Sequence, residues 1–241
     1  MKKLLLLIVL ALSTINYTSA QDYGFGLQGG LNTYKIGSVN SRGGSIAAGK
    51  PDEIFQPKKT IGYQFGAYFV AQFGKLFIKP EINYVSSKNK YDFPTKTSYW
   101  KTSKIDIPLL VGYEVFDPVS IYAGPGYNIY GDTTLDGVQI TSYSDGGPDL
   151  DKTAFNLNVG IMVRFKRIGI DLRYESGFKA TQEELLDIVY SAYGVNLADL
   201  RSYKPNTLRL SVFFDLFRSN GDDIGSFFSD LFKGNKCHCP Y

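Results

Sequence analysis

The fold is decided by the stretch KIDIPLLVGYEVFDPVSIYAGPGYNIY, which covers residues 104–130. From Ile105 to Val115 every second side chain is apolar, whereas Asp106, Gly112 and Glu114 stand among the positions between them. A period of two is typical of a strand that has two unlike faces. The first half of the stretch therefore predicts a β-strand with one apolar and one polar face.

The second half of the stretch predicts the partner strand. Asp117-Pro118 is a turn signal, and the alternation restarts after it through residues 119–129. Each strand is about a dozen residues long, which suits a tilted membrane-spanning strand better than the ~5–6 residues usual in a soluble sheet. We interpret the stretch as a hairpin that crosses a bilayer.

The same alternation recurs on both sides of this hairpin. It covers residues 23–35, 61–73, 76–84, 155–165, 168–175 and 208–216. Together with the central hairpin, these segments predict an all-β fold, an eight-stranded antiparallel up-and-down transmembrane β-barrel.

The connections alternate between short and long. Gly74-Lys75 and Lys166-Arg167 are two-residue turns, like Asp117-Pro118. The long connections are polar and fall near residues 36–60, 87–102, 131–152 and 179–205. In the last of them, TQEELLDIVYSAY has helical spacing, which predicts a helix with Thr181 as its N-cap. Short turns at one end and long loops at the other are typical of bacterial outer-membrane barrels, in which the turns are periplasmic and the loops extracellular.

A secreted eight-stranded pocket of the lipocalin type would place the apolar face inside. The apolar face carries roughly five large residues per strand, more than an eight-stranded interior can hold. The opposite face is instead rich in glycine, at positions 24, 26, 30, 62, 66, 112, 124, 126 and 160. We therefore expect the apolar face to meet lipid and the glycine-rich face to line a narrow interior.

The chain ends carry other signals. Residues 1–20 combine Lys2-Lys3, a short apolar run and small residues before Gln21, as a secretory signal peptide does. Residues 21–217 are the predicted barrel, and residues 218–241 form a periplasmic tail whose DIGSFFSDLF segment has the spacing of an amphipathic helix. We expect this helix to lie on the membrane surface, to plug the periplasmic mouth or to dock a partner.

Composition narrows the classes of function. Removal of Lys2 and Lys3 from the 26 basic residues leaves 24 against 23 acidic ones, and this balance predicts no nucleic-acid partner. Outside the first 20 residues no stretch approaches 18 uninterrupted apolar residues, which argues against helical membrane spans. The expected location is the outer membrane.

Several short motifs resemble a known family. They are residues 77–84 (FIKPEINY), 105–115 (IDIPLLVGYEV), 122–126 (YAGPG) and 171–175 (DLRYE). They are similar to the small outer-membrane β-barrel proteins of Bacteroidota that are called PorT-like, and the resemblance covers about residues 22–217. It implies a location and a fold more than an activity. One member of that broad family is linked to a secretion machinery, and the tail after residue 217 departs from its pattern.

Charged residues on the predicted inner face are nearly balanced. They are Lys79, Lys104, Arg164, Arg173 and Arg209, against Glu81, Asp106, Glu114, Asp171, Glu175 and Asp215. Buried charges cost several kcal/mol each unless they are paired, so the balance favours a network of ion pairs that fills the lumen. The alternative is an ion path, for which a surplus of one sign would be expected.

Catalysis and metal binding have weak support. Lipid hydrolases and acyltransferases usually need a histidine as general base, and the single histidine, His238, lies in the tail. Cys237-His238-Cys239 offers three possible metal ligands in consecutive positions without a fourth, and an oxidising periplasm favours a disulfide there. We predict no catalytic residues, no metal site and no cofactor.

Aromatic residues are expected to form girdles at the two membrane interfaces. We place Tyr23, Phe73, Phe77 and Phe165 near the turn end, and Tyr63, Tyr84, Trp100, Tyr130 and Tyr174 near the loop end.

The sequence thus predicts a non-enzymatic outer-membrane barrel with a structural or interaction role carried by its surface loops. A narrow pore, or an accessory component of a secretion or envelope complex, is the alternative. The expected partners are outer-membrane lipid, the barrel-assembly machinery during biogenesis and an envelope protein.

Overall fold

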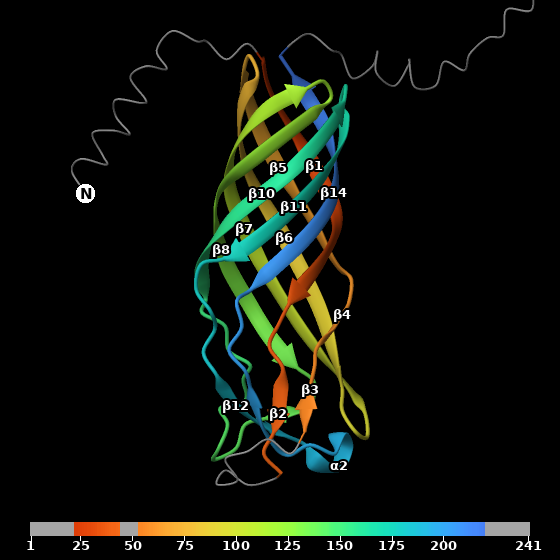
Figure 1. Cartoon of the computed structure of the whole chain (residues 1–241), viewed down its shortest axis with the longest axis vertical. Helices are drawn as coiled ribbons and strands as arrows, with labels where there is room; N and C mark the ends of the chain where they lie inside the picture. Colours follow the sequence, from red (N-terminus) through yellow and green to blue (C-terminus); the bar gives the residue numbers. More distant parts are fainter. Residues whose placement is uncertain (1–21, 44–52, 220–241) are drawn as a thin grey trace, which may run out of the picture.

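The computed structural model describes residues 22–43 and 53–219, which form a tall closed barrel (Figure 1). Its wall consists of eight long strands, β1 (Asp22–Lys35), β5 (Gly62–Phe73), β6 (Leu76–Asp92), β7 (Thr97–Phe116), β8 (Val119–Leu135), β10 (Thr153–Phe165), β11 (Ile168–Gly177) and β14 (Asn206–Arg218). The predicted signal peptide and the predicted tail helix lie outside the described residues.

The strands follow one another around the ring in chain order. Each pairs with the next in antiparallel fashion, and the pairing of β1 with β14 closes the ring. Gly30 of β1 illustrates the closure, because it lies opposite Ser211 of β14 and Gln64 of β5. The predicted up-and-down eight-stranded barrel is confirmed.

Side chains alternate between the two faces as the sequence predicts. On β7 the outward residues are Ile107, Leu109, Val111, Tyr113 and Val115, all exposed, while the neighbouring Asp106 is fully buried.

The glycines of the inner face leave room for aromatic rings. A Cβ on Gly26 would lie 2.4 Å from the Tyr68 hydroxyl oxygen, and one on Gly112 would lie 2.1 Å from the Phe77 ring.

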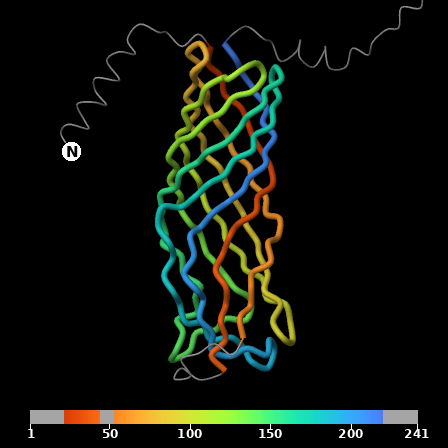
Figure 2. The backbone as a smooth tube through the Cα atoms, in the orientation of Figure 1, coloured from red at the N-terminus to blue at the C-terminus, as the bar shows by residue number. Residues whose placement is uncertain are grey.

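The three predicted two-residue turns all lie at one end of the barrel, which we call the turn end. Residues 74–75, 117–118 and 166–167 connect β5 to β6, β7 to β8 and β10 to β11. The start of β1 and the end of β14 lie side by side at the same end (Figure 2). The opposite end, where the long connections lie, is the loop end.

The expected polar loop at residues 87–102 is wrong. β6 continues to Asp92, a four-residue connection follows, and β7 begins at Thr97. The alternation persists there, with Asn89 and Tyr91 fully buried and Lys88 and Lys90 partly exposed. An alternation of apolar and polar residues is absent from the sequence here, because polar residues occupy the outward positions as well. Polar outward residues are expected where a hairpin extends beyond the lipid.

The long connections are not independent loops either. They contribute β2 (Val39–Ser41), β3 (Ile54–Phe55), β9 (Val138–Gln139), β12 (Glu184–Ile188) and β13 (Leu197–Leu200), which form a second sheet in the order β3-β2-β13-β12-β9. This sheet lies at the loop end, together with the short helix α2 (Tyr190–Tyr193) (Figure 1). We call these five strands and α2 the loop cap. The remaining short strand, β4 (Lys58–Lys59), pairs with β6.

The helix expected in TQEELLDIVYSAY is wrong for most of its length. Residues 184–188 form β12, and only residues 190–193 are helical, with Val189 and not Thr181 at the N-cap position. Thr181 instead exchanges hydrogen bonds with the backbone of Tyr203. Leu186 and Ile188 are fully buried in the loop cap, so pairing with distant strands outweighs local helical spacing.

Three of the predicted girdle aromatics point inward. Phe77, Trp100 and Tyr130 are buried, whereas Tyr23, Tyr63, Phe165 and Tyr174 are exposed on the outer face. Position along the strand explains the error, since Trp100 has the parity of the inward Lys104 on β7, and Tyr130 on β8 lies directly opposite Lys104. Among the helices of the described residues, none has the length and the apolar character to cross a membrane.

Candidate functional site

An ion-pair cluster lies across the middle of the barrel. Arg173 of β11 donates from both terminal nitrogens to the two carboxylate oxygens of Glu81 on β6, at 2.8 Å each. Lys79 lies 2.9 Å from the same carboxylate. Arg173 Nε also donates to the Tyr122 hydroxyl at 2.9 Å, and that hydroxyl donates to Asp171 at 2.6 Å. The cluster is fully buried, so each charge depends on its neighbours.

A second cluster lies closer to the loop end. Arg209 of β14 donates to Asp106 of β7 at 2.7 Å and also to Glu175 of β11. Lys104 and the Asn128 amide donate to the same Glu175 carboxylate. These five side chains come from four different strands and are all buried. They connect both sides of the barrel interior.

A third group lies near the turn end and includes residues that the sequence reasoning missed. Asp215 accepts a hydrogen bond from the Tyr68 hydroxyl at 2.5 Å and lies 3.1 Å from Arg218 Nε, but 3.9 Å from Arg164 Nε. Arg167, expected only as a turn residue, is buried and donates to the Asp215 carbonyl at 3.1 Å. The parity of Tyr68 along β5 could have placed it inside, whereas Arg218 has the parity of the outward Val212, and a register shift between β1 and β14 separates it from Asp215.

Of the eleven predicted inner charges, ten take part in ion pairs, and Glu114 does not. Glu114 is partly exposed near the turn end, where the Gln72 amide donates to it at 3.3 Å. It lies two residues from the end of β7, so solvent can reach its carboxylate.

Two apolar layers flank the ionic clusters. One lies toward the turn end and consists of Tyr68, Val70, Phe77, Leu110, Tyr122, Met162 and Phe213. The other fills the loop end and the loop cap, and it includes Tyr34, Val39, Phe93, Trp100, Leu186, Ile188 and Tyr203. In this second layer Trp100 packs edge-on against Tyr203, with ring centroids 6.3 Å apart. The interior is thus filled by alternating apolar and ionic layers.

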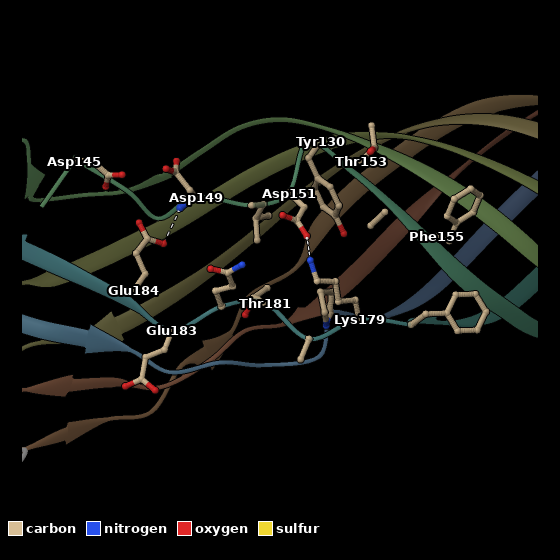
Figure 3. A pocket seen from close by; sticks show the side chains of 16 residues that line it. Tyr130, Asp145, Asp149, Asp151, Thr153, Phe155, Lys179, Thr181, Glu183 and Glu184 are labelled. Atoms are coloured by element: carbon tan, nitrogen blue, oxygen red, sulfur yellow. Dashed lines mark hydrogen bonds and ion pairs between the residues drawn. The ribbon is translucent and has the colours of Figure 1, made fainter.

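A cavity of about 630 Å³ opens beside the loop cap (Figure 3). The connection before β10 and the segment from β11 to β12 form its walls, and Tyr130 and Phe155 line it as well. Lys179 forms an ion pair with Asp151 at 2.9 Å across the cavity. Pockets of this size are common ligand sites.

Three carboxylates meet at one end of this cavity. Those of Asp145, Asp149 and Glu184 lie within 4.8 Å of one another, and the Asp149 backbone N–H donates to Glu184 at 2.9 Å. Burial raises the pKa of Glu184 above its ordinary value of 4.5, and the negative charges of Asp149 and Asp145 raise it further. Asp145 and Asp149 are exposed, and exposed acidic groups are common without a metal, so the trio alone does not identify a metal site. Cys237-His238-Cys239 lies outside the described residues.

Comparison with known proteins identifies the family. Residues 19–182 match the family described as outer membrane protein beta-barrel domain. Among curated proteins there is no match.

Similar solved structures include Neisserial surface protein A, NspA, with 15% identity and a TM-score of 0.41 over 81% of this chain and 99% of that one. Ail, the attachment invasion locus protein of Yersinia pestis, has 13% identity and a TM-score of 0.38, over 82% of this chain and 98% of that one. The outer membrane protein AlkL has 11% sequence identity and a TM-score of 0.38, over 80% of this chain and 90% of that one. Likenesses this distant carry no argument about function. The family match covers more than half of the sequence, and the chain therefore belongs to the outer-membrane β-barrel domain family and is located in the outer membrane.

Proposed function

We propose that this outer-membrane barrel is a non-enzymatic interaction protein whose binding surface is the loop cap. The observation that carries the proposal is that the long connections fold together into one five-stranded sheet over an aromatic core, and do not form separate loops. Ordering a loop costs conformational entropy, about 1–2 kcal/mol per residue for the backbone. A barrel that needed only to span the membrane would gain nothing from that cost.

A preformed surface binds partners with less entropic loss than a set of mobile loops. The loop cap offers the exposed apolar side chains of Ile54 and Tyr190 on such a surface, and Ile140, directly after β9, is exposed as well. Exposed apolar residues outside the lipid-facing band are candidates for protein contacts. An envelope protein is therefore the partner that we favour, in addition to outer-membrane lipid on the barrel wall and the assembly machinery during biogenesis.

The alternative, a narrow pore, is disfavoured by the packing of the interior. Ion pairs connect opposite strands, and apolar layers lie on both sides of them. The absence of catalysis is inferred from family membership and from the lack of a histidine outside the tail. Assignment to the PorT-like proteins of Bacteroidota, and with it a role beside a secretion machinery, stays a proposal that rests on the sequence motifs alone.

Co-purification from gently solubilised outer membranes tests the proposal. The wild type should retain a stable envelope partner, and a variant with Ile140→Ser and Tyr190→Ser should lose it while remaining a folded barrel. Lys75→Ser at the turn end is the matched control and should retain the partner. Recovery of the wild type without a partner, or equal capture by the loop-cap variant, would contradict a binding role for this surface.

A further inference from the structure

Four lysines share the outer face of the barrel wall toward the loop end of the β6–β7 hairpin, the yellow hairpin of Figure 1. Lys88 of β6 lies directly opposite Lys101 of β7. Two residues further along β6, Lys90 lies directly opposite Lys58 of β4. Asn89, between the two β6 lysines, is fully buried, so the lysines point outward. We call these four lysines the lysine patch.

The acids beside the lysine patch neutralise it only in part. Like charges directly opposite one another in a sheet are destabilising, and the patch contains two such pairs. Asp92 lies 2.6 Å from Lys58 and 4.0 Å from Lys90. Asp136, which follows β8, lies 3.3 Å from Lys101. Two carboxylates thus face four ammonium groups, which leaves a net positive surface.

Lys88 lies at the centre of the patch, between Lys101 across the hairpin and Lys90 on its own strand. Its Nζ lies 4.1 Å from the centre of the Tyr99 ring. An aromatic ring attracts a cation without removing its charge. Lys88 forms no ion pair with a residue that the structure describes, and neither does Asp132, the exposed acid on the neighbouring β8. The charge of Lys88 is therefore available to an anion outside the chain.

The height of the patch above the apolar band indicates the source of that anion. Tyr84, four residues before Lys88 on β6, packs against Tyr63 and Phe65 of β5, with ring centroids 6.4 Å and 5.3 Å apart. Outward aromatic rings of this kind mark the membrane interface. Four residues of a strand rise about 13 Å, or roughly 10 Å along the membrane normal at a tilt of about 40°. A lysine side chain can bend back over part of that height, which places its ammonium group beside the lipid headgroups.

The opposite wall of the barrel has the reverse charge at its loop end. β11 lies opposite β6 in the ring, and the larger cavity beside the loop cap lies where β10 and β11 reach the loops. Five carboxylates line that cavity together with one lysine, Lys179. An anionic headgroup would be repelled there and attracted to the lysine patch.

We propose that the lysine patch binds the phosphate groups of anionic lipids in the outer leaflet, and that the barrel recruits such lipids to this wall and not to the opposite one. An ammonium group offers three hydrogen-bond donors to phosphate oxygens. Free phosphate shares this chemistry, but the apolar band directly below the patch also holds the acyl chains of a lipid. The proposal rests on the outer-membrane location and is independent of the protein partner proposed for the loop cap.

Quenching of a reporter tryptophan by brominated lipid tests the proposal with the full-length protein in phosphatidylcholine vesicles. Trp100→Phe removes the single tryptophan of the chain, and Tyr84→Trp places a new one on the outer face below the patch. Brominated phosphatidylglycerol should associate at this reporter about fivefold more strongly than brominated phosphatidylcholine, the factor expected for one lysine near an anionic surface. Lys88→Gln with Lys101→Gln should lower this ratio to about one.

Two controls use the opposite wall. Tyr174→Trp, in place of Tyr84→Trp, puts the reporter at an exposed position of β11, where the ratio should be about one with or without the lysine changes. Lys152→Gln with Lys179→Gln removes the same amount of charge from the opposite side. It should leave the ratio at the Tyr84→Trp reporter unchanged.

A ratio of about one at the Tyr84→Trp reporter with all lysines present overturns the proposal. Equal preference at the two reporters overturns it too, because anionic lipid would then surround the barrel evenly. Loss of the preference on addition of inorganic phosphate at constant ionic strength shows a site for a free oxyanion and also contradicts the proposal.

A second measurement covers reporter variants that fail to fold. Without the reporter changes, phosphatidylglycerol in the vesicles should raise the thermal midpoint of the wild type more than that of the Lys88→Gln, Lys101→Gln variant. Equal shifts contradict the lipid site. Co-purification of an envelope partner is a separate readout, so failure of the lipid site and failure of the proposed function are distinguishable.

Discussion

Arg173 and Glu81 form a two-pronged ion pair, 2.8 Å at each contact, between strands that lie four places apart around the eight-stranded ring in either direction. β6 and β11 are thus opposite walls of the barrel. Arg209 and Asp106 repeat the relationship between β14 and β7 at 2.7 Å. Ion pairs therefore connect opposite walls of the barrel at two levels of its interior. The same ion pairs both stabilise the barrel and block its lumen.

The first prediction concerns the stability of this pairing. Glu81→Ala leaves Arg173 and Lys79 buried without their shared carboxylate, and breaking a buried ion pair in this way costs about 3–5 kcal/mol. Urea unfolding of the protein in lipid vesicles should report a loss of that size. Glu114→Ala, which removes a partly exposed carboxylate without an ion pair, is the control and should change the free energy of unfolding by less than about 1 kcal/mol.

The second prediction separates a filled lumen from a pore. The wild type should show negligible conductance in planar bilayers, because paired charges and apolar layers fill its interior. In a water-filled pore each charge would be solvated separately, so Arg173→Ala would alter ion selectivity and leave the thermal midpoint nearly unchanged. Steady, selective conductance of the wild type, with unchanged stability of that variant, would decide for the channel.

The sequence predicts the membrane part of this fold well because its rule is local. On β7 the alternation of Leu109 and Val111 with Asp106 specifies both the strand and the face that meets lipid. The charged residues of the lumen occupy the inward positions of the same alternation. Most members of the ionic network could therefore be predicted without knowledge of which side chains meet. The geometry of the pairs could not, since Arg173 and Glu81 are 92 residues apart.

The loop cap could not be predicted, for a related reason. Residues 184–188 pair with residues 197–200 and with 138–139, and only these distant partners turn a segment with helical spacing into β12. Inward aromatics such as Trp100 resemble interface residues by type, and only their position in the alternation of the strand places them inside.

The third prediction concerns the loop cap. Trp100 of β7 is fully buried in the apolar layer that the loop cap shares with the barrel, and Trp100→Ala should destabilise the cap by about 3–5 kcal/mol, as large-to-small changes in a core do. Limited proteolysis of the protein in detergent should then cleave the segment from residue 178 to residue 205. The barrel itself should keep its heat-dependent shift on a denaturing gel. Tyr190→Ala, at an exposed position of α2, is the control and should leave the cap resistant to protease.

The fourth prediction concerns orientation. Short epitope tags inserted after Gly43 or Asp145, both exposed at the loop end, should be detected on intact cells. Tags inserted at Lys75 or Lys166, in the turns at the opposite end, should be detected only after the outer membrane is opened. This follows from the arrangement of outer-membrane barrels, in which long loops are extracellular and short turns periplasmic. The reverse pattern of detection would overturn the orientation.

The last prediction is a pH dependence of the loop cap. Because burial and the charges of Asp149 and Asp145 raise the pKa of Glu184 in the folded cap above 4.5, the folded state holds a proton that the unfolded segment has lost. The resulting stabilisation is fully present below pH 4.5 and is lost as the pH rises through the raised pKa. Amide hydrogen exchange in β12 should therefore slow as the pH falls through that window, after correction for intrinsic exchange. Glu184→Gln should abolish this trend, whereas Glu183→Gln, which removes an exposed partner of Arg201, should preserve it. A trend that persists in Glu184→Gln would assign the pH dependence to other groups.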